Sequence, residues 1–275
     1  MKTSVVVSTY NRPRALNLVL EGLSRQSLPP DQIVIGDDGS GADTAKVIDS
    51  WRDKGLPIEH CWHEDKGYRK TLVMNRAVAR STSDLLIFLD GDCVPLPSFV
   101  ADHVLLHQPG FIHAGPRMLA SERLTKALES RASIDSLGHL FFLKNRLLGR
   151  VNRIAPLIRL PDGEWRVSQP TKWELVRGCN FSVERSSVIE VDGFEGSLFG
   201  WGPDDSDIAV RLINSGLKVK SLRFAAPVLH LWHPEESRGN LEQNRSYLRA
   251  ALESKRVVAQ LGISKLPPIE DFRAL

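Results

Sequence analysis

The chain contains few cysteines, and their placement argues against a fold stapled by disulfides. Cys61, Cys93 and Cys179 are the only thiols among 275 residues, and they lie far apart in the sequence. An odd and sparse set of this kind fits no disulfide framework and indicates a reducing compartment. The three thiols also lack the paired spacing of a structural zinc site.

Long apolar runs are absent as well. No segment approaches the roughly 20 consecutive apolar residues that span a bilayer. The chain runs directly into the strand-like residues 4–8, where a signal peptide would carry a basic region and then a long apolar one. We therefore expect a cytoplasmic protein, either free in solution or peripheral on the inner face of the cytoplasmic membrane. The formal net charge is only +3, so the overall charge does not indicate a nucleic-acid partner.

Strand and helix patterns alternate through the first hundred residues. Apolar runs predict strands near residues 5–7, 33–35, 58–62 and 85–89, and apolar residues at helical spacing predict helices near 16–23, 44–51 and 71–80. The run at 85–89 is apolar at every position, which is typical of a strand buried on both faces of a parallel sheet. The order therefore predicts a Rossmann-like α/β fold with a mostly parallel central sheet and helices on both faces.

The second half of the chain is less regular. Residues 175–183 and 228–234 look like strands. Residues 204–214 are predicted to form a helix, with Pro203 beside its start and Gly216 just past its end. Residues 131–172, here called the basic insert, show no clear period.

Polar residues follow three predicted strands, where doubly wound sheets bind their ligands. These segments are residues 9–12, 37–40 and 90–92. Asp90 and Asp92, separated by a glycine, can turn toward one Mg²⁺ or Mn²⁺ ion, which would neutralise charge on a leaving diphosphate. Asp37 or Asp38 can accept hydrogen bonds from a base or a ribose. The simpler alternatives are an Asp-Gly turn and an N-cap cluster.

A basic segment precedes the third predicted helix. Lys66 and Arg69 lie close to its N-terminus, and Asn75 lies within it. Cations at such a position suit a diphosphate, although a solvated basic loop has the same composition.

Acidic residues cluster at the start of the helix predicted at residues 204–214. Asp204, Asp205 and Asp207 crowd the start of the predicted helix, where the helix dipole stabilises negative charge. Three carboxylates exceed the needs of one cap, and Trp201 adds a flat apolar face that suits a sugar ring. One carboxylate could take the proton from an attacking hydroxyl.

Two histidines, His230 and His233, occur in the last predicted strand. Residues three apart on a strand point in opposite directions. We therefore expect only one of them to face a metal ion, unless the chain bends.

In order and approximate spacing, these motifs resemble the family 2 glycosyltransferases, with a second half similar to the galactosyltransferase-type segment of chondroitin polymerase. The resemblance implies a glycosyltransferase A type fold and an inverting mechanism. It implies that Tyr10 stacks on the base, that Asp205 is the catalytic base, and that Asp92 binds the metal ion with His230 or, second, His233. The candidate acceptor contacts are Trp201, Gly202 and Asp204. The candidate donor contacts are Thr9, Tyr10, Asn11, Arg12, Asp37, Asp38, Lys66, Arg69, Asn75, Asp90, Gly91 and Asp92.

The expected reaction moves a hexose or N-acetylhexosamine from a UDP-sugar to a saccharide acceptor, with Mn²⁺ or Mg²⁺ as cofactor. Residues 1–105 would form a nucleotide-sugar-binding half and 106–275 an acceptor-binding half of one continuous domain. The expected acceptor is a glycan or glycolipid in lipopolysaccharide, capsule or exopolysaccharide assembly. A non-catalytic carbohydrate-binding protein and a sugar nucleotidyltransferase are the alternatives. The latter normally has a glycine-rich loop after its first strand, where this chain has residues 9–12.

The basic insert combines cations with apolar residues. Its Lys and Arg side chains are Arg131, Lys144, Arg146, Arg150, Arg153, Arg159, Arg166 and Lys172. Interleaved leucines and phenylalanines suit a helix on an anionic membrane surface or one that binds a phosphorylated glycolipid. The alternative is an amphipathic helix packed on the core.

Overall fold

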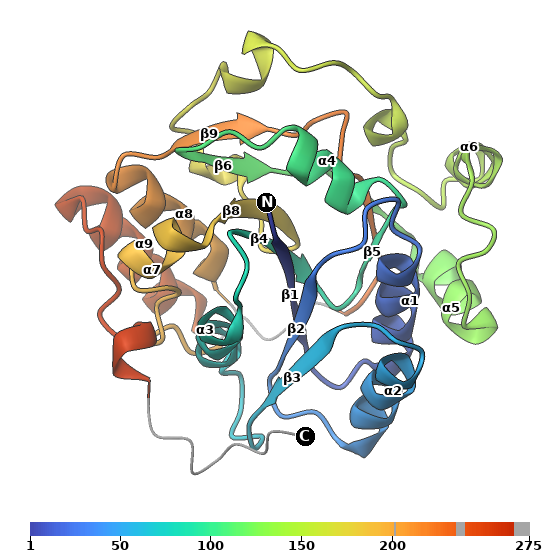
Figure 1. Cartoon of the computed structure of the whole chain (residues 1–275), viewed down its shortest axis with the longest axis horizontal. Coiled ribbons are helices and arrows are strands. Elements are labelled where there is room, and N and C mark those ends of the chain that lie inside the picture. Colours follow the sequence, from blue (N-terminus) through green and yellow to red (C-terminus); the bar gives the residue numbers. More distant parts are fainter. Residues whose placement is uncertain (201, 235–239, 267–275) are drawn as a thin grey trace.

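A seven-stranded sheet forms the centre of the molecule (Figure 1). The computed structural model describes residues 1–200, 202–234 and 240–266. Strand order is β3-β2-β1-β4-β8-β6-β9. The strands are β1 (Thr3–Thr9), β2 (Gln32–Asp37), β3 (Ile58–Trp62), β4 (Leu85–Asp90), β6 (Phe111–Ala114), β8 (Asn180–Glu184) and β9 (Lys218–Ser221). Only β8 runs against its neighbours, so the predicted mostly parallel sheet is confirmed.

Helices cover both faces of this sheet, because its inner strands bury successive side chains on opposite sides. Val5 and Val7 pack with α1 (Pro13–Ser24), α2 (Ala42–Asp53) and α4 (Phe99–Leu105). Val6 packs on the other face with α3 (Lys70–Arg80), α7 (Arg185–Glu190) and α8 (Asp204–Asn214). Figure 1 shows α1 and α2 on one side of the sheet and α3 and α8 on the other.

A smaller sheet links distant parts of the chain. It consists of β5 (Cys93–Pro95), β10 (Val228–His230) and β7 (Arg117–Leu119), with β10 in the middle. The strand predicted at 228–234 therefore ends at His230. The strand predicted at 175–183 begins only at Asn180, because a short 3₁₀ turn (Trp173–Leu175) and a loop precede it.

The remaining helices belong to the second half of the chain. They are α5 (Glu122–Arg131), α6 (His139–Leu147), α9 (Leu241–Ser254) and the 3₁₀ turns Ala155–Leu157, Glu164–Val167 and Ile263–Lys265. Because strands from residues 1–105 and 106–275 share the central sheet, both halves form one folded body. Among the described residues, no helix is both long and apolar enough to cross a membrane.

The third carboxylate of α8 belongs to the core. Asp207 and Arg211 are both fully buried, and Arg211 Nε donates to Asp207 Oδ2 at 2.8 Å. The guanidinium also donates to the carbonyl oxygens of Val191 and Gly193, and Arg256 donates to Asp207 Oδ1. Asp207 therefore anchors α8, whereas Asp204 and Asp205 make their contacts outside this network.

Arg211→Met should lower the free energy of unfolding by about 3–5 kcal/mol, because the buried Asp207 carboxylate loses the positive charge and the hydrogen bond of Arg211. Arg249→Met is the matched control, since Arg249 pairs with Glu242 on the exposed surface of α9 and should lose less than about 1 kcal/mol. Denaturant unfolding measures both. Equal losses in the two variants would contradict the anchoring role.

Candidate active site

A cleft of about 1490 Å³ opens where β1 and β4 end. Its walls come from both halves of the chain, including residues 8–15, 90–92, 177–179, 202–206, 230 and 232–234. Sites for a single small molecule commonly have volumes of ~300–1000 Å³. The cleft therefore has room for more than one substrate.

The turn after β4 is held tightly against β1. Gly91 N donates to the Ser8 carbonyl oxygen at 2.7 Å, and a Cβ at position 91 would meet that oxygen at 2.7 Å. Only glycine allows this approach. The Asp90 carboxylate accepts a hydrogen bond from Ser8 Oγ at 2.7 Å, so the turn fixes the carboxylate as well as the backbone.

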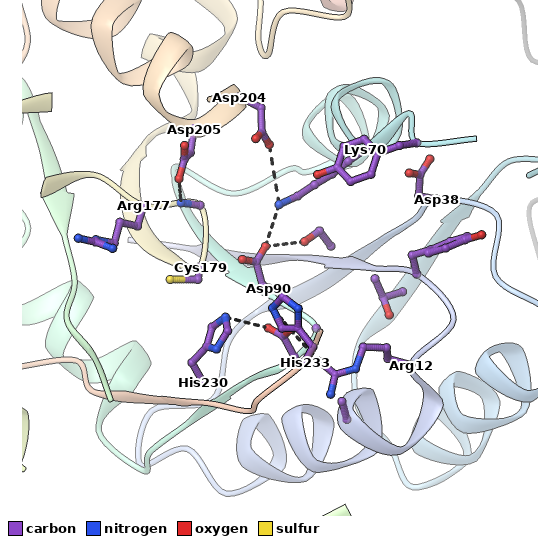
Figure 2. Close-up of a pocket in the computed structure, with 18 of the residues that line it drawn as sticks. Arg12, Asp38, Lys70, Asp90, Arg177, Cys179, Asp204, Asp205, His230 and His233 are labelled. Carbon is purple, nitrogen blue, oxygen red and sulfur yellow. Dashed lines mark hydrogen bonds and ion pairs between the residues drawn. The ribbon is translucent and has the colours of Figure 1, made fainter. Parts of the chain in front are cut away.

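Lys70, the first residue of α3, joins the two sides of the cleft (Figure 2). Its Nζ lies 3.0 Å from Asp90 Oδ1 and 3.8 Å from Asp204 Oδ2. Burial alone would lower the pKa of Lys70, but the two carboxylates raise it well above its usual value. Burial raises the pKa of Asp90, yet Lys70 and Ser8 outweigh burial, so the pKa is lowered and Asp90 is ionised at neutral pH.

Asp204 and Asp205 begin α8 on the opposite wall. Burial, with further repulsion from Asp205 and Asp90, raises the pKa of Asp204 to about 6, even though Lys70 opposes the change. Asp205 is oriented by backbone donors: Oδ2 accepts from Gly178 N at 2.9 Å and Oδ1 from Ser206 N at 2.8 Å. Lys70 therefore compensates the charge of Asp204, and backbone N–H groups fix the orientation of Asp205.

Asp92, His230 and His233 form a group with one ligand atom each, all within 4.8 Å of one another. His230 Nε2 lies 3.7 Å from Asp92 Oδ1, and His233 Nε2 lies 3.5 Å from Asp92 Oδ2. Both histidines face this point, which is the exception that the prediction made for a chain that bends, because β10 ends at His230. Leu231 N donates to the Asp92 carbonyl oxygen and fixes this bend.

This donor set fits a divalent ion such as Mn²⁺, which accepts carboxylate and imidazole ligands. Burial lowers the pKa of His230 despite the opposing charge of Asp92, so the imidazole stays neutral, as a metal ligand must. Arg12 Nη1 also contacts Asp92 Oδ2 at 2.9 Å, so the positive charge of a guanidinium lies beside the group.

Two cysteines meet at the cleft, where Cys179 belongs to the lining and Cys93 lies behind it. Cys93 and Cys179 each offer a sulfur atom within 4.8 Å of the other and of an Asp90 oxygen. Both are buried, and burial, followed by the contact with Cys179, raises the pKa of the Cys93 thiol. Arg117 Nη1 lies 3.7 Å from the Cys179 sulfur. Nothing in the separation of these residues along the chain indicates this pairing.

On the donor side, the structure brings most predicted residues into the cleft. Its lining includes Thr9, Tyr10, Asn11, Arg12, Asp38, Asp90, Gly91 and Asp92. Tyr10 is 46% exposed, and its hydroxyl donates to Asp65. Asp37 does not reach the cleft, because it is buried and bonded to His60 and to Ser40 N.

Three other predicted donor contacts lie outside the cleft lining. Asn75 is fully buried, and its amide bonds the backbone N–H and carbonyl of Phe194. The Arg69 side chain donates to the Glu64 carbonyl oxygen, and Lys66 pairs with the Glu64 carboxylate. The structure thus gives these three side chains other partners and places none of them in the cleft lining.

Some lining residues were not predicted as site residues. They are Ser8, Tyr68, Lys70, Arg117, Arg177, Gly178 and Trp232, among others. Lys70 directly follows Arg69, so the basic segment indicated the region but not the residue. On the acceptor side, Gly202, Asp204 and Asp205 line the cleft, whereas Trp201 lies outside the described residues.

Asp92→Asn should weaken binding of Mn²⁺ alone by at least about tenfold, since changes around metal ligands commonly cost 10–100-fold in affinity. Isothermal titration with manganese chloride measures this without any substrate. Asp43→Asn, the same change on the exposed surface of α2, is the control. Unchanged affinity in Asp92→Asn would contradict the assignment of this group.

Solved glycosyltransferase structures share the fold. TarS 1-349 from S. aureus, in complex with UDP-GlcNAc, aligns with a TM-score of 0.61 at 13% identity, covering 96% of this chain and 69% of that one. The mannosyltransferase PcManGT from Pyrobaculum calidifontis, in complex with GDP-Man and Mn²⁺, aligns with a TM-score of 0.57 at 16% identity, covering 93% and 62%. These likenesses confirm the glycosyltransferase A type fold.

Relatives identified by sequence include a glucosyltransferase and a polysaccharide synthase. Validoxylamine A glucosyltransferase of Streptomyces hygroscopicus subsp. limoneus is 27% identical over 227 residues, covering 78% of this chain and 48% of that protein. Chondroitin synthase of Escherichia coli is 22% identical over 287 residues, covering 96% and 38%. The chain thus spans about half or less of the length of these relatives.

Two family models match successive parts of the chain and meet in the cleft. The model of the N-terminal domain of galactosyltransferase matches residues 166–234, which include Asp205 and both histidines. The glycosyl transferase family 2 model matches residues 4–142, which include Asp90 and Asp92. The predicted resemblance is confirmed, and the chain belongs to glycosyl transferase family 2.

Proposed function

We propose that this glycosyltransferase is inverting and Mn²⁺-dependent, with Mg²⁺ as the alternative ion. It moves a hexose or N-acetylhexosamine from a UDP-sugar to a saccharide acceptor. One observation carries the proposal: a carboxylate–imidazole group and an oriented carboxylate, Asp205, line the same cleft. The UDP-GlcNAc in TarS and the Mn²⁺ in PcManGT support the donor class and the ion.

The donor occupies the side of the cleft built mainly by residues 1–105, with His230 and His233 beside Asp92. Tyr10 stacks on the base, and Asp38 accepts a hydrogen bond from the base or ribose. Asp92, His230 and His233 hold the divalent ion, which when bound neutralises charge on the leaving diphosphate. Arg12 lies beside Asp92 and offers the diphosphate a further cation.

The acceptor occupies the side built by residues 106–275. Asp205 takes the proton from the attacking hydroxyl, and the N–H groups of Gly178 and Ser206 hold its carboxylate in place. Asp204 and Gly202 contact the acceptor sugar. A base on the acceptor side and charge stabilisation on the leaving-group side suit a single displacement, which inverts the anomeric centre.

The acceptor is a glycan or glycolipid of lipopolysaccharide, capsule or exopolysaccharide assembly. Chondroitin synthase, a relative over nearly the whole of this chain, supports a polysaccharide product. The cleft lining includes Trp173, Trp232 and Pro234, which offer apolar surface for sugar rings.

Asp205→Asn should reduce transfer by about 10²–10⁴-fold, because the variant loses its general base. Binding of the UDP-sugar should stay within about twofold of wild type, because the change lies on the acceptor side. Product formation and calorimetric donor binding measure the two effects. Asp43→Asn, also in the first turn of a helix, is the control.

The donor for this test comes from a panel of UDP-sugars assayed with and without Mn²⁺. Normal transfer by Asp205→Asn would overturn the assignment of the base. No metal-dependent turnover on any donor would instead favour a non-catalytic carbohydrate-binding protein, and a nucleotide-transfer product would favour a nucleotidyltransferase.

A further inference from the structure

Helix α6, in the basic insert, turns leucines toward solvent. Leu140 and Leu147 are 82% and 80% exposed, and Leu143 and Leu148 are 47% and 52% exposed. The opposite face is anchored, because Phe142 is buried in the main core. The helix therefore packs on the core through one face, and its other face presents an apolar stripe that nothing in the described structure covers.

The stripe has cations on both edges. Leu140, Leu143 and Leu147 are spaced three and four residues apart, so they lie on one side of the helix. At about 100° per residue, Lys144 falls beside one edge of this stripe and Arg146 beside the other. Both cations are exposed. We call these five residues the α6 face.

The charge around the α6 face is of one sign. Residues 136–161 contain Lys144, Arg146, Arg150, Arg153 and Arg159 and no acidic residue, whereas the whole chain carries a net charge of only +3. Arg159 pairs with Asp102 and Arg153 donates to the Arg117 carbonyl oxygen. In the described part of the chain, no carboxylate pairs with Lys144, Arg146 or Arg150.

We propose that the α6 face binds an anionic lipid bilayer. Leu140, Leu143 and Leu147 enter the boundary between headgroups and acyl chains, and the flanking cations contact lipid phosphates. A second copy of this chain fits poorly, because two such faces would bring like charges together. An acidic protein could neutralise the cations, but a stripe of leucines with cations along its edges matches the layered chemistry of a bilayer surface more closely.

The position of α6 connects this surface to the cleft. Helix α5, immediately before α6 in the chain, contributes Thr125, Lys126 and Glu129 to the cleft lining. Figure 1 shows α6 at the edge of the molecule, beyond the helices that cover the central sheet. A bilayer at the α6 face would hold a lipid-linked acceptor near this wall. Membrane binding itself requires neither donor nor turnover, so it stands or fails independently of the proposed function.

Vesicle sedimentation tests the proposal with the full chain and no substrate. We expect binding to vesicles of phosphatidylcholine with phosphatidylglycerol, and binding to phosphatidylcholine alone that is at least about tenfold weaker. Leu140→Ser/Leu147→Ser should weaken binding to the anionic vesicles by at least about tenfold. Leu28→Ser/Leu252→Ser, which changes two exposed leucines outside the insert, is the control and should bind as wild type does.

A second pair of changes keeps the test decisive if the leucine variant misfolds. Lys144→Gln/Arg146→Gln should weaken binding to anionic vesicles and reduce its dependence on salt concentration. Equal binding to both kinds of vesicle, or binding unaffected by either double variant, would overturn the proposal. Dimerisation in analytical ultracentrifugation that Leu140→Ser/Leu147→Ser abolishes, without vesicle binding, would also overturn it and assign the face to a second copy.

Discussion

The contact of Lys70 with Asp90 and Asp204 is the interaction on which the cleft depends. It places one cation between carboxylates that come from the two halves of the chain. Without it, these partly buried carboxylates would repel each other across the site. Lys70 keeps Asp90 ionised and limits the rise in the pKa of Asp204, so both walls of the cleft can stay close together.

Around this contact the cleft separates two chemical tasks. Asp92 and the two histidines gather on one side, and Asp205 is held by backbone N–H groups on the other. In the proposed reaction, the first group serves the leaving diphosphate and the second serves the attacking hydroxyl. Positioning and leaving-group electrostatics then supply most of the acceleration. The metal group itself draws on both matched parts of the chain, because Asp92 lies within residues 4–142 and the two histidines lie within 166–234.

Much of the fold and of the cleft was predictable, because parallel strands deliver their carboxyl ends to one edge of a sheet. Apolar runs located β1 to β4, and residues 9–12, 38 and 90–92 followed from them. The direction in which each side chain points was harder to predict from the sequence. Asp37 and Asp38 are neighbours, yet only Asp38 faces the cleft, and Lys70 rather than Arg69 reaches it from the start of α3. The bend after His230 depends on tertiary contacts that no local period records.

The anomeric configuration of the product tests the central claim most directly. With a donor that the enzyme accepts, NMR of the earliest product measures the configuration at the transferred carbon. A single displacement between the metal group and Asp205 predicts inversion relative to the donor. Retention would contradict the account, because it requires a second displacement or a different attack geometry that this arrangement of carboxylates does not provide.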